Sequence, residues 1–261
     1  MKIVRYQKSG EVFYGKLEDK NIYPIEGDVF GDLKIRSKPI KREEVKLLAP
    51  IYPPNIIAIG LNYKKHADEI NLGYPEKPVI FLKATSSMIG PEDKIMLPSM
   101  APNEVDYEAE LAIVIGKKAK NVEVEEADDY ILGYTCGNDV SARDCQIRLD
   151  KQWARGKSFD TFCPLGPWVE TELIKPDECR IMSRLNGKIM QDSNTSDMVF
   201  NTKELLSYCS KNLTLYPGTV IMTGTPEGVG CTRNPGVFLK SGDSIEIEIE
   251  GIGKIVNEVT G

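Results

Sequence analysis

Acidic residues alternate along one segment of the chain, VDYEAELAIVIG, which contains Asp106, Glu108 and Glu110. In an extended strand, side chains two residues apart point to the same face, so these three carboxylates would share a face. Beyond Glu110 the segment is apolar on both faces, which predicts a strand covered on both sides. Glu108 and Glu110 would then lie at the mouth of a buried region, where desolvation and like charge oppose ionisation unless a cation holds the pair. The two glutamates are therefore candidate metal ligands, although the pattern alone leaves a structural role open.

A second segment, SIEIEIEG, repeats the spacing with Glu246, Glu248 and Glu250. Here isoleucines occupy the intervening positions, and strict alternation is typical of a strand with one buried and one solvated face. We therefore expect these glutamates to form a solvated strand face rather than a metal site.

Asp139 is the candidate for a third ligand, because it follows the largely apolar segment ILGYTCGN. Aspartate is unfavourable in a strand, so it either caps the turn through Ser141 to Asp144 or holds another group. If Asp139 joins Glu108 and Glu110, all three ligands are carboxylates. Such a set, without Cys or His, favours Mg²⁺, Mn²⁺ or Ca²⁺ over zinc.

The chain contains a single histidine, His66, in the segment IIAIGLNYKKHADEI. His66 and Glu69 are three residues apart, so they share a face if the segment is helical. An imidazole oriented by a carboxylate can take and return a proton near neutral pH. A purely structural or exposed histidine is the alternative.

Lys157 lies in QWARGKSFDTFCPLGP, where Gly156, Lys157 and Ser158 suggest a phosphate-binding loop. The first glycine of that motif would fall at Lys151 and no apolar strand precedes it, so nucleotide binding is not predicted. Lys157 could instead stabilise an oxyanion, or its ammonium group could reach solvent. The glycine-rich turn of VIMTGTPEGVG, which includes Thr225, can offer N–H and hydroxyl groups to a carboxylate.

The composition excludes several classes of protein. The 261 residues are 41% hydrophobic and 28% charged, with a net charge of -6, so there is no basic footprint for nucleic acid. No apolar run approaches the roughly 18 to 20 residues that cross a bilayer. The N-terminal segment lacks the apolar core of a signal peptide, and the six cysteines form no C-x-x-C pair. We expect a cytoplasmic enzyme with reduced thiols and no membrane partner.

A change in charge divides the chain near residue 50. The first 50 residues contain 11 Lys and Arg against 8 Asp and Glu, whereas the remainder is acidic. The change coincides with Pro50 and the Pro53-Pro54 pair, and short alternating runs precede it. We predict a small β-rich N-terminal domain over residues 1–53 and a catalytic domain over residues 54–261.

Strands outnumber helices in the predicted large domain. Helical patterns occur at residues 123–132 and 202–212, and Asn201 and Glu204 have the spacing of a capping box. Strands are predicted at residues 56–60, 78–84, 94–98, 105–116, 133–140, 219–223 and 244–250. The chain is therefore expected to be mainly β with a few helices, in the α+β class.

Six segments, in this order, resemble the fumarylacetoacetate hydrolase family: GLNYKKHADE, PVIFLKATSSMIGP, VDYEAELAIVIGK, GYTCGNDVSARDCQ, GKSFDTFCPLGPW and TGTPEGVG. The resemblance spans nearly all of residues 54–259. It implies a mixed β-sandwich or β-roll catalytic domain with a small N-terminal domain. It also implies a homodimer and one Mg²⁺ or Mn²⁺ ion per chain.

The resemblance also implies roles for individual residues. The implied metal ligands are Glu108, Glu110 and Asp139. His66 and Glu69 would activate water or move protons, and Lys157 would stabilise developing negative charge. The residues implied to line the substrate and metal-water site are Lys83, Arg143, Gln146 and Thr225. A further aspartate ligand of fumarylacetoacetate hydrolase itself has no match, so the chain is more similar to the short, three-carboxylate members.

The chemistry shared by those members starts from a 2-oxo acid. Its carboxylate and keto oxygens can chelate one divalent ion, which polarises the carbonyl and stabilises an enolate. Acylpyruvate-type C–C hydrolysis is the leading expectation. The alternatives are an oxaloacetate decarboxylase or tautomerase, and an isomerase of 2-hydroxyhepta-2,4-diene-1,7-dioate type. A non-catalytic protein that binds a metal or a carboxylate ligand is the alternative from another class.

Overall fold

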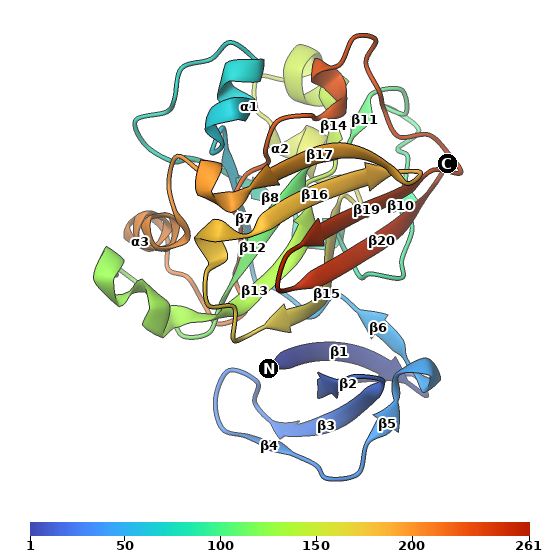
Figure 1. Cartoon of the computed structure of the whole chain (residues 1–261), viewed down its shortest axis with the longest axis vertical. Coiled ribbons are helices and arrows are strands. Elements are labelled where there is room, and N and C mark those ends of the chain that lie inside the picture. Colours follow the sequence, from blue (N-terminus) through green and yellow to red (C-terminus); the bar gives the residue numbers. More distant parts are fainter.

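Strands dominate the protein, which a computed structural model describes over all of residues 1–261 (Figure 1). They form a 13-stranded mixed sheet, a five-stranded sheet and a two-stranded ribbon. The helices are few and short. The chain is therefore mainly β in the α+β class, as the sequence predicts.

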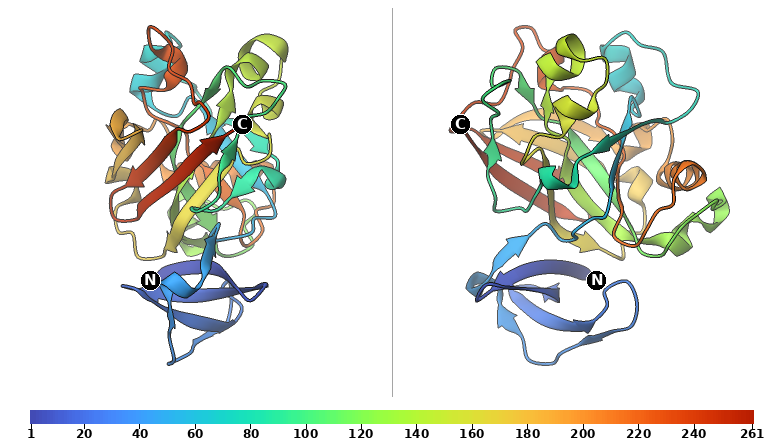
Figure 2. Two further views of the ribbon diagram at one scale, coloured as in Figure 1. Left: turned by 90° about the vertical axis from the view of Figure 1, so that its right-hand side faces the viewer. Right: turned by 180° about the vertical axis from the view of Figure 1, so that it is seen from behind.

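The first six strands form one end of the large sheet and lie together beneath the rest of the molecule, in blue (Figure 2). Their bounds are β1 (Lys2–Lys8), β2 (Glu11–Glu18), β3 (Asn21–Gly27), β4 (Leu33–Ile35), β5 (Ile40–Lys41) and β6 (Lys46–Leu48). β1 also pairs with β15 (Cys163–Glu170), so backbone hydrogen bonding continues into the main body. The predicted division into domains at residues 53 and 54 stays a prediction.

The main body of the large sheet has the spatial order β15-β13-β12-β18-β7-β8, with β9 beside β15. The bounds of the remaining strands are β7 (Ile56–Gly60), β8 (Val79–Lys83), β9 (Met88–Ile89), β12 (Ala109–Ile115), β13 (Ile131–Asn138) and β18 (Val220–Met222). Leu111 and Ile113 of β12 belong to one buried cluster, and Ala112 and Val114 belong to another. β12 is thus covered on both faces, as its unbroken apolar sequence predicts.

The second sheet packs against β12 and β13, which it partly covers in the view of Figure 1. Its order is β10-β20-β19-β16-β17. The bounds are β10 (Ile95–Met96), β16 (Arg180–Leu185), β17 (Lys188–Asn194), β19 (Ser244–Ile249) and β20 (Gly253–Thr260). The isoleucines of β19 are buried, whereas Glu246 and Glu248 are partly exposed and pair with Arg184. The second E-x-E segment is therefore a partly solvated strand face, as expected.

The longest helix, α3 (Thr202–Asn212), begins and ends at the predicted residues. Asn201 accepts hydrogen bonds from the first turn while Glu204 accepts one from the Asn201 amide, which completes the predicted capping box. The helix predicted at residues 123–132 is instead a 3₁₀ helix, η3 (Val124–Tyr130). The other helices are η1 (Arg42–Glu44), α1 (Lys64–Glu69), η2 (Thr85–Ser87), the π-helix η4 (Asp144–Leu149), α2 (Ala154–Lys157), η5 (Pro176–Glu178), η6 (Thr195–Asp197) and η7 (Gly230–Thr232).

The strand predicted over residues 105–116 is interrupted. β11 (Val105–Asp106) pairs with β14 (Ser141–Ala142), and β12 begins only at Ala109. Between the two, the Glu108 amide donates to the Asn138 side chain instead of to a backbone carbonyl of the neighbouring strand. Asp106 lies outside the group formed by Glu108, Glu110 and Asp139 and does not line the cavity, although it shares Arg143 with Glu108. The alternation of three acidic residues therefore does not produce one cluster of three: Asp106 is separate, and Asp139 completes the group instead.

All six cysteines are free and all but Cys231 are buried, in agreement with the expected reduced thiols. None of the helices has the length and apolar character required to span a bilayer. The cytoplasmic location stays a prediction.

Candidate active site

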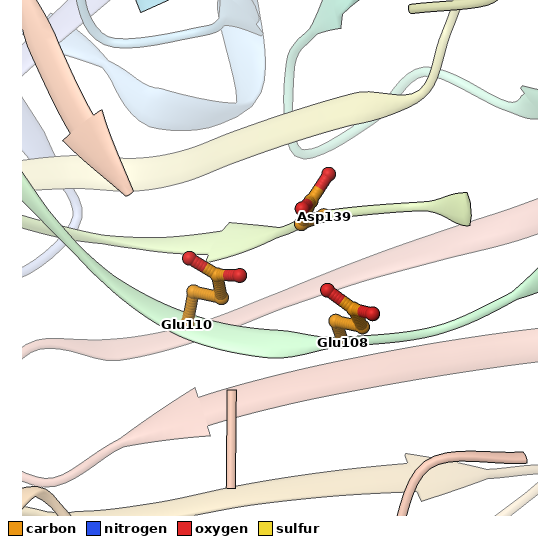
Figure 3. Close-up of side chains that lie close together, drawn as sticks. All are labelled: Glu108, Glu110 and Asp139. Carbon is orange, nitrogen blue, oxygen red and sulfur yellow. The ribbon is translucent and has the colours of Figure 1, made fainter. Parts of the chain in front are cut away.

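Three buried carboxylates converge where β12 runs beside the end of β13 (Figure 3). Antiparallel pairing places Glu110 opposite Gly137, and the Asp139 amide donates to the Glu108 carbonyl at 2.9 Å. One carboxylate oxygen from each of Glu108, Glu110 and Asp139 lies within 4.8 Å of those of the other two. The structure therefore brings the three predicted ligands into one buried cluster.

Three cations surround this cluster. Lys157 Nζ lies 2.7 Å from Glu108 Oε2 and 2.7 Å from Asp139 Oδ2. Arg143 Nη1 lies 2.7 Å from Glu108 Oε1, and Lys83 Nζ donates to Asp139 Oδ1. Because both Asp139 oxygens bind lysines, the structure supports the interpretation of Asp139 as a holding group rather than a turn cap.

Glu108, just before β12, and Glu110, within it, have opposite electrostatic environments. Burial alone would raise the pKa of Glu108, but Lys157 and Arg143 outweigh it and lower this pKa to about 2. Burial also raises the pKa of Glu110, and the negative charges of Asp139 and Glu108 raise it further. Glu110 accepts one hydrogen bond, from the Gly224 amide at 2.8 Å. Glu110 is thus the member of the group that no lysine or arginine contacts directly.

The donor set fits a divalent metal ion. Oxygen ligands suit Mg²⁺ and Mn²⁺, and all three carboxylates are buried within reach of one another. Around the site the buried carboxylates number four and the buried Lys and Arg side chains three, which leaves a formal charge of -1 if all are ionised: Asp106, Glu108, Glu110 and Asp139 against Lys83, Arg143 and Lys157. A divalent cation would reverse that sign and leave a net positive charge for an anionic substrate.

The predicted histidine–glutamate pair forms on α1. His66 Nδ1 lies 3.1 Å from Glu69 Oε2. Glu69 also accepts hydrogen bonds from the Gly228 amide at 3.1 Å and the Thr232 hydroxyl at 2.8 Å. Burial by itself would raise the pKa of Glu69, but these hydrogen bonds from His66, Thr232 and Gly228 lower it overall. Glu69 is therefore held as a carboxylate that orients the imidazole.

His66 and the three carboxylates line the same cavity, which has a volume of about 260 Å³. One part of its wall is polar and is formed by His66, Glu108, Glu110, Asp139, Arg143, Gln146, Lys157 and Thr225. The other part is largely apolar and includes Ile59, Leu61, Ile70, Leu72, Phe81, Ile147 and Trp153. Because pockets for drug-sized ligands occupy about 300–1,000 Å³, this cavity suits a small acid.

Lys83, which the resemblance implies for the substrate and metal-water site, contacts Asp139 and is not part of the cavity wall. Its side chain is fully buried and lies outside the cavity wall. Its ammonium group donates to Asp139 and to the Lys157 carbonyl. Lys83 thus supports Asp139 from behind instead of facing a substrate. Lys83 is the last residue of β8, and its side chain extends to Asp139 instead of to the cavity. Nothing in the local sequence indicates this contact.

Sequence reasoning missed the part played by the loop at residues 228–232. Its backbone amides at Gly230 and Cys231 donate to the buried Asp106 carboxylate at 2.7 and 2.9 Å. Asp106 in turn accepts from Arg143 Nε at 2.8 Å. The same loop holds Glu69, so it links the imidazole to the cluster. The glycines of TGTPEGVG signal a turn, but not which carboxylates the turn meets.

This fold and this site define a known class. Residues 55–260 match the family described as "Fumarylacetoacetate (FAA) hydrolase C-terminal", and residues 1–50 match "Rv2993c-like, N-terminal". The chain belongs to the fumarylacetoacetate hydrolase family. The protein is an enzyme of that family, which argues against the non-catalytic alternative.

Particular relatives are more informative about activity. The chain is 49% identical over 223 residues to the mitochondrial oxaloacetate tautomerase Fahd2a of Rattus norvegicus, covering 84% of this chain and 71% of that protein. A 5-carboxymethyl-2-hydroxymuconate delta-isomerase structure from Mycobacterium smegmatis is 41% identical, with a TM-score of 0.90 and coverage of 100% and 99%. A 2-hydroxyhepta-2,4-diene-1,7-dioate isomerase structure from Mycobacterium marinum is 37% identical, with a TM-score of 0.89 and coverage of 100% and 98%.

Proposed function

We propose that this enzyme interconverts the enol and keto forms of oxaloacetate or a closely related small 2-oxo acid, with Mg²⁺ or Mn²⁺ at Glu108, Glu110 and Asp139. The observation that carries the proposal is the meeting of the carboxylate cluster and His66 in one small cavity. The similarity to the rat oxaloacetate tautomerase favours tautomerisation over the other family reactions.

The bound divalent cation would polarise the keto carbonyl and stabilise negative charge on its oxygen. His66 moves the proton. Because Nδ1 is held by Glu69, a neutral imidazole leaves Nε2 as the acceptor for the enol hydroxyl proton. The proton taken from oxygen is matched by one delivered to C3, so the overall charge does not change. Glu69 fixes the ring and stabilises the imidazolium that forms between the two transfers.

Lys157 supplies positive charge at the same place. An ammonium group has three N–H donors, and two of them are directed at Glu108 and Asp139. The third remains for an oxygen of the substrate. Burial alone would lower the pKa of Lys157, but Asp139 and Glu108 outweigh it and raise this pKa, so the group stays charged.

Acylpyruvate hydrolysis is the second candidate, and the apolar part of the cavity wall favours it. Leu72, Phe81 and Trp153 could pack against an alkyl group carried by an acylpyruvate. The His66–Glu69 pair would then activate a water molecule against the acyl carbonyl.

The homodimer implied by the family stays a prediction, which light scattering would check.

Loss of the enol absorbance of oxaloacetate tests the proposal, with the spontaneous reaction in the same metal buffer subtracted. Chelation should abolish the enzymatic rate, and Mg²⁺ or Mn²⁺ should restore it. His66→Asn should lower kcat by at least about a hundredfold, the usual contribution of a general acid–base group. Lys64→Ala, at an exposed position of the same helix, is the control and should retain the rate.

The proposal would be refuted by full activity after exhaustive chelation or in a Glu108→Ala/Glu110→Ala variant. Product analysis with an acylpyruvate separates the two candidates. Release of pyruvate and a free acid at a rate above that of oxaloacetate ketonisation would establish hydrolysis as the main activity. Unchanged acylpyruvate would leave tautomerisation.

A further inference from the structure

Gln191 of β17 is a buried carboxamide that no step described so far uses. Only 1% of its surface is exposed. Its Oε1 accepts hydrogen bonds from the Ala109 amide at 3.0 Å and the Ser183 hydroxyl at 2.9 Å. Its Nε2 donates to Thr225 Oγ1 at 2.8 Å and to the Pro226 carbonyl at 2.9 Å. Every hydrogen-bonding position of this side chain is therefore occupied.

These partners allow only one orientation of the carboxamide. The Ala109 backbone N–H can only donate, so it must face the side-chain oxygen. The Pro226 carbonyl can only accept, so it must face the side-chain nitrogen. A flipped amide would set its NH₂ group against the Ala109 N–H and its oxygen against the Pro226 carbonyl, and neither contact can be a hydrogen bond.

The fixed orientation determines what Thr225 offers. Both protons of the Gln191 amide are used, one on Pro226 and one on Thr225, so the Thr225 hydroxyl accepts this hydrogen bond. It makes no other hydrogen bond within the protein, and the residue lines the cavity. Its own proton is therefore left for a ligand oxygen. The Ser183 hydroxyl donates to Gln191 Oε1, and Gln191 Nε2 donates to the Thr225 hydroxyl oxygen. Hydrogen bonds in such a chain polarise one another, which strengthens the Thr225 hydroxyl as a donor.

The same carboxamide also fixes the metal-ligand strand. Ala109, whose amide it accepts, lies between Glu108 and Glu110. The loop that it holds at Thr225 and Pro226 begins at Gly224, whose amide donates to Glu110. Gln191 thus joins the five-stranded sheet to both sides of the site.

We propose that Gln191 is a positioning residue that makes the Thr225 hydroxyl a dedicated hydrogen-bond donor to the carboxylate of the 2-oxo acid. This inference rests on the proposed function. It predicts that reversing the polarity of the Nε2 end of residue 191 weakens substrate binding through Thr225, because a carboxyl group keeps the oxygen that accepts from Ala109 and Ser183.

Gln191→Glu makes that reversal with little change in shape. An ionised carboxylate donates to neither partner. A protonated one gives its single proton to the Pro226 carbonyl, which can only accept, so in both states the Thr225 hydroxyl turns to donate to residue 191. Calorimetry with oxalate and saturating Mg²⁺ provides a readout that needs no turnover. Oxalate affinity should fall at least about tenfold, as expected for one hydrogen bond to a charged group. Since the contact forms in both the ground and transition states, KM should rise by a similar factor while kcat changes little.

Thr225→Val should weaken oxalate to the same extent, and Thr225→Ser should restore most of the affinity. In the Thr225→Val background, Gln191→Glu should cause no further loss. Asn257→Asp is the matched control, because Asn257 is 1% exposed and its amide donates to the carbonyls of Gly90 and Asp93. It should lower stability without changing oxalate affinity.

Several results would overturn the inference. One is an equal loss on Gln191→Glu with and without Thr225, and another is an equal loss in Asn257→Asp. If Gln191→Glu does not fold, the Thr225 variants decide. Unchanged oxalate affinity in Thr225→Val rejects the inference, and a loss that Thr225→Ser restores supports the inference. Failure of the wild-type protein to bind oxalate with Mg²⁺ would instead refute the proposed function itself.

Discussion

Replacing Asp106 with asparagine should destabilise the protein by about 3–5 kcal/mol, the cost of removing one partner from a buried ion pair. Each carboxylate oxygen of Asp106 accepts two hydrogen bonds. Oδ1 binds the Tyr107 and Gly230 amides, and Oδ2 binds the Cys231 amide and Arg143 Nε. An asparagine must direct its NH₂ group at one of these pairs of donors, whichever way it is turned. Arg143, whose pKa Asp106 raises against the effect of burial, would also lose part of its compensation.

Urea unfolding in the presence of a chelator measures this change without a contribution from bound metal. Asp192→Asn is the matched control, since Arg180 pairs with Asp192 through two contacts of 2.8 and 2.7 Å at a side chain that is 40% exposed. We expect that variant to lose at most about 1 kcal/mol. The reasoning fails if the two variants lose similar free energies of unfolding.

Three further outcomes are expected. Glu110→Gln should weaken Mg²⁺ binding, measured by calorimetry, more than about tenfold. Glu248→Gln, on the partly solvated strand β19, should leave Mg²⁺ binding unchanged. Equal effects of the two variants would contradict the different roles assigned to the two E-x-E segments. The folded-state pKa of Glu69 is lowered, so the stability advantage of wild type over Glu69→Gln should be complete above the unfolded-state pKa of about 4.3 and shrink as pH falls below it. Thermal unfolding from pH 7 to 3 checks this, and an advantage that grows on acidification would exclude it. Asn201→Ala should cost about 1 kcal/mol through loss of the capping box, with no effect on Mg²⁺ affinity.

The parts of the structure that follow from local sequence could be predicted. α3 carries its own start signal in Asn201 and Glu204, and β19 shows its buried face through alternating isoleucines. Glu108 and Glu110 could be identified because a pair of charges among apolar residues requires compensation. Each of these signals lies within one element and needs no knowledge of its neighbours.

The remaining features depend on contacts between distant segments. Asp106 has the same spacing from Glu108 as Glu110 has, yet the interruption between β11 and β12 turns it toward Arg143. Lys83 is the last residue of β8, and its local sequence does not differ from that of residues that line the cavity. Its burial depends on the contact with Asp139, which belongs to a distant segment of the chain. Gln191 gave no signal, since a glutamine at a strand position is ordinary until its four partners are known.

The manner in which the loop at residues 228–232 grips Asp106 has a consequence for how the enzyme can diversify. Cys231 holds Asp106 through its backbone amide and also lines the cavity. A mutation at this position can therefore reshape the space offered to a substrate while the anchoring bond persists. Directed evolution for new acids can therefore start at this position, because the backbone bond to Asp106 does not depend on which side chain residue 231 carries.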